Sequence, residues 1–109
     1  MFLNINLNTI YYFPIMGSEQ QSAHILITGR VRGVGFRHFI KRWADTLHLQ
    51  GTVRNLFRGE VEVLVEGPRE VLEQFITVLR EGPPGSAVRE CHVDWRPVLR
   101  AFKGFSIGH

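Results

Sequence analysis

Apolar and polar residues alternate in several short stretches of the chain, which is typical of β-strands that bury one face. These stretches are residues 24–28, 51–56, 60–66, 91–95 and 105–107. In the third of them, valines occupy every second position, so we expect the valines to be buried and the intervening glutamates to be solvated. The glutamates that we expect along this solvated strand edge are Glu60, Glu62 and Glu66.

Two other stretches place their apolar residues at the helical spacing of i, i+3, i+4 and i+7. The first stripe covers residues 36–47, and Gly51 soon after it favours a helix end there. The second stripe covers residues 71–79, after Pro68, which suits the first turn of a helix. The Gly-Pro-Pro-Gly run at 82–85 ends that helix. The first stripe, which we expect in the core, consists of Phe36, Phe39, Ile40, Trp43, Ala44 and Leu47.

The order of these elements is β-α-β-β-α-β followed by a short closing strand. It predicts an α+β fold of the ferredoxin-like class, a split βαβ sandwich (βαββαβ) with two helices on one face of an antiparallel sheet. In this arrangement we expect the second strand to lie beside the first. The first βαβ unit then forms a right-handed crossover, and this crossover begins with the loop between the first strand and the first helix.

The first sixteen residues contain no charged side chain, unlike the rest of the chain. They lack the positive start of a signal peptide, and they are too short and too polar for a membrane-spanning helix. The polar residues that follow, up to Ser22, are typical of a flexible lead-in. We interpret residues 1–22 as an N-terminal extension outside the core, with Met16 as the natural start, and residues 23–109 as the folded domain. An additional edge strand within the extension is the alternative.

The composition of the chain limits the kinds of ligand and the cellular location that we expect for it. Its 109 residues suit one domain, and a net charge of +3 favours anionic ligands without resembling a polybasic nucleic-acid-binding tail. The single cysteine, Cys91, excludes an intrachain disulfide and fits the cytoplasm. Cys91 alternates with Val93 and Trp95, so we expect Cys91 in the core rather than as a nucleophile, and both Trp95 and Trp43 as core aromatics. The histidines show no metal-ligand spacing, so we expect no metal and no other cofactor.

The glycine-rich stretch from Gly29 to Arg37 carries the strongest chemical signal. Glycines let a backbone turn tightly and approach a ligand, and a helix N-terminus offers free N–H groups and partial positive charge. Arg37 adds a planar, charged guanidinium that fits phosphate geometry. Because a positive side chain is disfavoured at a helix N-terminus, a bound anion explains Arg37 better than a solvated role does. We expect the neighbouring His38 on the surface.

Other anion-binding and RNA-binding motifs fit this stretch less well. It has no Lys followed by Ser or Thr, as a P-loop requires, and His38 stands where the dinucleotide motif needs glycine. Residues 32–39 partly match the RNA-recognition signature, which places its base-stacking aromatics on a strand. Phe36 and Phe39 belong instead to the helical stripe, so RNA binding is the weaker alternative.

Two segments together resemble the two signatures of the acylphosphatase family. The segments are Gly29-Arg30-Val31-Arg32-Gly33-Val34-Gly35-Phe36-Arg37 and Gly51-Thr52-Val53-Arg54-Asn55-Leu56-Phe57-Arg58-Gly59-Glu60-Val61. The resemblance extends from about Ala23 to the C-terminus. It implies a ferredoxin-like fold and the metal-independent hydrolysis of acyl phosphates to a carboxylate and inorganic phosphate.

The resemblance also implies which residues form the site. The family's catalytic arginine and asparagine correspond to Arg37 and Asn55, and its phosphate-binding backbone loop corresponds to Arg32, Gly33, Val34, Gly35, Phe36 and Arg37. The chain departs from the family at Arg32, where many members have glutamine and the backbone contributes most, and at Thr52, where an aromatic residue is common.

The chemistry of these side chains fits the implied reaction. Asn55 offers one amide acceptor and two donors, which can orient a water molecule without deprotonating it. We therefore expect an acyl phosphate as the small-molecule partner and inorganic phosphate as the product, with no nucleic acid, no membrane and a monomeric state. A non-catalytic phosphate-binding module of the same fold is the main alternative.

Overall fold

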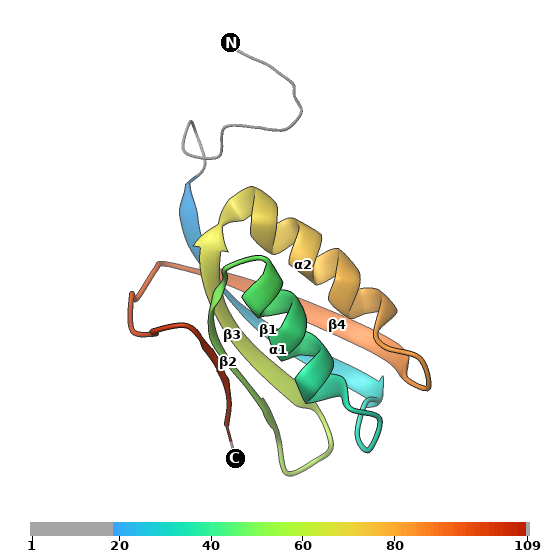
Figure 1. Cartoon of the computed structure of the whole chain (residues 1–109). Coiled ribbons are helices and arrows are strands. Elements are labelled where there is room, and N and C mark those ends of the chain that lie inside the picture. Colours follow the sequence, from blue (N-terminus) through green and yellow to red (C-terminus); the bar gives the residue numbers. More distant parts are fainter. Residues whose placement is uncertain (1–18, 109) are drawn as a thin grey trace.

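The computed structural model describes residues 19–108, and the expectations for residues 1–18 lie outside this range. Figure 1 shows one sheet with both helices over the same face. The strands are β1 (Gln20–Arg30), β2 (Gln50–Asn55), β3 (Val61–Pro68), β4 (Ala87–Arg96) and β5 (Phe105–Ile107), and the helices are α1 (Phe36–Thr46) and α2 (Arg69–Glu81). The ferredoxin-like α+β class predicted from the sequence is confirmed. Neither of the helices described is long and apolar enough to cross a membrane.

The strand order in the sheet is β4-β1-β3-β2-β5. The prediction that the second strand lies beside the first is therefore wrong, because β3 pairs with both and separates them. Since β3 is antiparallel to each neighbour, β1 and β2 run in the same direction and end on the same side of the sheet. This shared end is where the site forms.

The sheet is mixed rather than purely antiparallel, because β5 pairs with β2 in parallel. β4 is antiparallel to β1 and therefore ends on the side of the sheet where β2 begins. The connection from β4 to β5 crosses the sheet at that side, so β5 starts there and runs in the direction of β2.

The sheet also begins earlier than the predicted domain boundary. Gln20 pairs with Pro68, and Ser22 pairs with Glu66, so these residues belong to β1 rather than to the predicted N-terminal extension. Ser22 is buried. Backbone pairing with β3 extends the strand through this polar segment. The segment has no alternation of apolar and polar side chains, so the sequence did not indicate this extension.

The core lies between the sheet and the two helices. The alternate valines of β3 are fully buried, as predicted, and they pack with Ile25 and Ile27 of β1. Helix α1 buries Phe36, Ile40 and Ala44, and α2 buries Leu72, Phe75, Ile76 and Leu79.

Trp43 is 38% exposed, so its prediction as a core aromatic is wrong. The buried residues of α1 follow the i, i+4, i+8 row, whereas Trp43 lies on the adjoining row at the margin of the contact. Trp95 is partly buried against the core, with the Arg69 guanidinium 3.8 Å above its ring. Cys91 also packs against the core, and burial raises the pKa of its thiol despite the nearby Arg80.

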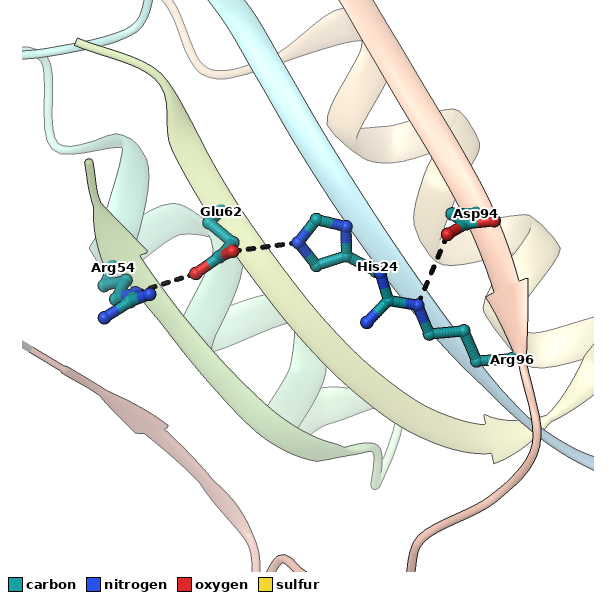
Figure 2. A network of polar contacts seen from close by, with 5 residues as sticks. All are labelled: His24, Arg54, Glu62, Asp94 and Arg96. Atoms are coloured by element: carbon teal, nitrogen blue, oxygen red, sulfur yellow. Dashed lines mark hydrogen bonds and ion pairs between the residues drawn. The ribbon is translucent and has the colours of Figure 1, made fainter. Parts of the chain in front are cut away.

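The glutamates of β3 do not form a solvated edge, because β3 lies between two other strands. Figure 2 shows that Glu62 accepts hydrogen bonds from His24 of β1 (2.8 Å) and Arg54 of β2 (2.7 Å). Glu66 is buried, and its two oxygens accept hydrogen bonds from the backbone N–H groups of Leu99 (2.7 Å) and Arg100 (3.0 Å). The connection between β4 and β5 thus covers the polar face of this strand at Glu66.

Candidate active site

The loop between β1 and α1 has a backbone that favours glycine. Gly33 and Gly35 have φ angles of 73° and 72°, in the left-handed region. A Cβ atom at either position would meet no other atom within 4 Å, so backbone conformation rather than space accounts for these glycines. The turn leads directly into α1, for which Gly35 is the N-cap.

The N-terminus of α1 presents free backbone donors. The first helical hydrogen bond runs from the Phe39 N–H to the Gly35 carbonyl (3.0 Å), so the N–H groups of residues 36–38 have no partner of this kind. No side chain caps this end, and its first turn contains no acidic residue. Such an uncapped helix N-terminus after a glycine turn is suited to binding an anion.

A pocket of about 230 Å³ opens at this helix end. It brings together the two predicted catalytic residues, Arg37 of α1 and Asn55 at the end of β2. The residues that line it are Val31, Arg32, Gly33, Gly35, Phe36, Arg37, His38 and Asn55. Two hollows elsewhere on the described surface are larger, but they contain neither Arg37 nor Asn55.

The predicted loop residues all line this pocket except Val34, which packs against the core instead. His38 is exposed, as predicted, and also lines the pocket. The prediction omitted Val31, which is buried and forms part of the pocket wall. Val31 follows the alternating first strand and directly precedes Arg32, and this position could have indicated that Val31 lines the site.

The charges around the pocket suit an anionic ligand. Arg37 is half-buried, and none of the other residues from 19 to 108 accepts a hydrogen bond from its guanidinium. The lining includes no carboxylate that would compete for it. The guanidinium and the free N–H groups therefore remain available to a phosphoryl group.

A second arginine connects the two halves of the pocket. The Arg32 guanidinium donates a hydrogen bond to the carbonyl of Leu56, at a distance of 2.6 Å. Leu56 directly follows Asn55, so the loop after β1 is joined to the end of β2. The described residues, 19–108, include no group of three or more His, Cys, Asp or Glu side chains placed to hold a metal ion.

Comparisons with known proteins agree with this geometry. A family model described as acylphosphatase matches residues 23–107. An acylphosphatase of Salinibacter ruber is 46% identical over 81 residues, which cover 74% of this chain and 85% of that protein. An acylphosphatase of Syntrophotalea carbinolica is 42% identical over 83 residues, covering 76% and 90% of the two chains.

A solved structure gives the same result. The crystal structure of acylphosphatase from Bacillus subtilis matches with a TM-score of 0.79 and 38% identity, covering 82% of this chain and 99% of that one. The fold and the pocket define a ferredoxin-like domain with an anion site at the N-terminus of its first helix. Together with the sequence matches, they show that the chain belongs to the acylphosphatase family.

Proposed function

We propose that the protein hydrolyses acyl phosphates to a carboxylate and inorganic phosphate, in the pocket that Arg37 and Asn55 share. One observation carries this proposal: two residues from separate elements line a single pocket at an uncapped helix N-terminus. Membership of the acylphosphatase family supports the same reaction.

Binding of the phosphoryl group falls to the loop and to Arg37. The N–H groups of residues 36–38 and the Arg37 guanidinium together surround the phosphoryl oxygens with donors. Their partial and full positive charges also offset the negative charge on these oxygens in the transition state. Because these donors are held by a glycine turn and a helix, little reorganisation accompanies the reaction.

The hydrolytic step requires a water molecule in line with the bond that breaks. The Asn55 side-chain carbonyl accepts a hydrogen bond from this water and orients its oxygen toward phosphorus. A P–O bond forms from the water oxygen, and the bond between phosphorus and the acyl oxygen breaks. The carboxylate leaves with the electron pair, and a phosphate oxygen receives the water proton, so no side chain has to act as a strong base.

The geometry supports hydrolysis over RNA binding. Phe36 is only 2% exposed, and Phe39 packs edge-on against it, with ring centroids 5.9 Å apart. Neither ring is free to stack on a base in the way that the RNA-recognition motif requires. A non-catalytic phosphate-binding module would bind inorganic phosphate in the same pocket, but it would release none from acetyl phosphate.

Replacing the two proposed catalytic residues tests the assignment. Arg37→Ala should abolish most substrate binding and most of the rate. Asn55→Ala should lower kcat on the order of 10²- to 10³-fold while competitive inhibition by phosphate persists, because one preorganised contact is lost. The measurement is phosphate release from acetyl or benzoyl phosphate. Arg42→Ala, an exposed arginine of α1, and Gln50→Ala, an exposed residue of β2, are the matched controls. Full activity in either test variant would refute these roles.

We also propose that the protein works as a cytoplasmic monomer with no nucleic-acid partner. A single cysteine in the sequence and a modest net charge of +3 support this proposal. Sedimentation of the purified chain at micromolar concentration tests the oligomeric state, and a single-stranded RNA titration at two salt concentrations tests nucleic-acid binding.

A further inference from the structure

We propose that Arg32 is a positioning residue that holds Asn55 in place through the carbonyl of Leu56. The inference rests on the proposed function, because it concerns how Asn55 is placed for hydrolysis. It assigns a role to the Arg32 side chain, whereas the family resemblance implies only a backbone role at this position.

The strand order leaves room for such a connection. β1 leads into the phosphate-binding loop and β2 ends at Asn55, yet β3 lies between these two strands. Adjacent strands are about 4.8 Å apart, so the ends of β1 and β2 are separated by roughly 10 Å. Val61 of β3 pairs with both Ile27 and Asn55, so the backbone ladders set the strand ends, but they reach neither the loop at 31–35 nor the turn after Asn55. A long side chain can connect these two segments.

Arg32 spans this separation. Its guanidinium donates to the Leu56 carbonyl at 2.6 Å, a short distance typical of a charged donor. Among residues 19–108, this is the only hydrogen bond between the loop at 31–35 and the segment at 55–60. Arg32 is therefore the direct hydrogen-bonded link between the anion-binding loop and the segment that follows Asn55.

Leu56 is also the residue that organises the hairpin turn after Asn55. Its N–H donates to the Glu60 carbonyl (2.8 Å), and its carbonyl accepts from the Gly59 N–H (3.1 Å) as well as from Arg32. A hydrogen bond to this carbonyl consequently orders the turn as a whole. Loss of that bond lets the end of β2 move relative to the loop.

Kinetics distinguish this positioning role from a direct role in binding substrate. Arg32→Met preserves the length of the side chain but removes its donors, and it should lower kcat about 10-fold or more while KM changes less than about threefold. Arg32→Lys keeps a charged donor and should recover most of kcat. Arg30→Met removes an exposed arginine two residues away and should leave both constants unchanged. A rise in KM with kcat unchanged would overturn the inference in favour of substrate binding.

A double-mutant cycle tests whether Arg32 acts through Asn55. In an Asn55→Ala background, Arg32→Met should cost less than about twofold in kcat, because the group that it positions is already absent. A loss as large as in the otherwise unaltered protein would show that Arg32 acts independently and would overturn the inference.

A measurement without substrate separates failure of this inference from failure of the proposed function. Amide ¹⁵N relaxation should show greater mobility at residues 56–59 in Arg32→Met than in the unaltered protein or in Arg32→Lys. An unchanged turn would overturn the positioning role even if the enzyme were active. Absence of acyl phosphate hydrolysis by the unaltered protein would instead refute the proposed function, whatever the mobility of the turn.

Discussion

At the scale of single residues, the Glu62 carboxylate joins three strands on the sheet face opposite the helices (Figure 2). Burial raises the pKa of Glu62, but the hydrogen bonds and charges of His24 and Arg54 outweigh it, so the net pKa is lowered. The neighbouring pair of Asp94 and Arg96 is exposed and 3.3 Å apart, which makes its contribution to stability small. Glu62 is therefore the carboxylate that links pH to the stability of β2, the strand that ends at Asn55.

A substitution at Glu62 should reveal this link. A carboxyl whose pKa is lower in the folded state stabilises the fold above the unfolded value, about 4.3, and this contribution is lost as pH falls through the folded value. Glu62→Gln should cost about 1 kcal/mol at pH 7, because the half-exposed Arg54 weakens the pair, and the difference should vanish in acid. Urea unfolding between pH 7 and pH 3 measures it. Glu90→Gln, at an exposed residue of β4, is the control, and a pH-independent cost at Glu62 would contradict the prediction.

Single residues also show where prediction from sequence succeeds and where it stops. Arg37 and Asn55 were predicted together because two separate motifs identify them, and both line one pocket. The alternation along β3 separates its two faces correctly, but it carries no information about which distant segment covers the polar face. For this reason the burial of Glu66 beneath the backbone of residues 99–100 could not be predicted.

At the scale of elements, periodicity predicts all seven helices and strands of the described chain, but not the neighbours of each strand. Local spacing depends on which side of each element is buried, whereas strand order depends on pairing between distant segments. Both β1 and β2 pair with β3, so Asn55 reaches the loop because the two strands end on the same side, not because they are adjacent. The long side chain of Arg32 reaches from the loop after β1 to Leu56, directly after the end of β2.

Also at this scale, the connection between β4 and β5 is bound to the sheet through the side chain of Glu66. Glu66→Gln replaces one buried acceptor oxygen with an amide nitrogen, which leaves a backbone N–H of residue 99 or 100 without its partner. The expected loss is about 1–3 kcal/mol of unfolding free energy. Hydrogen exchange should accelerate at these two amides more than in β1. Glu60→Gln, directly before the same strand, is the control, and uniform acceleration across the sheet would indicate a global rather than a local effect.

At the scale of the whole molecule, the anion site and the stability of the fold are linked through binding. Phosphate that binds only the folded chain should stabilise it by about 1.4 kcal/mol at ten times its Kd, which raises Tm by several degrees in a domain of this size. Arg37→Ala should lose most of this shift, whereas Asn55→Ala should retain it, because Arg37 holds the anion and Asn55 orients water. Differential scanning fluorimetry in phosphate and in potassium chloride of equal ionic strength makes the measurement.

Phosphate also stabilises proteins non-specifically by exclusion from their surface, and the residual shift in Arg37→Ala measures that part. Equal shifts in the unaltered protein and in Arg37→Ala would place the anion outside this pocket, and an equal loss in both variants would show that Asn55 binds phosphate as well as water.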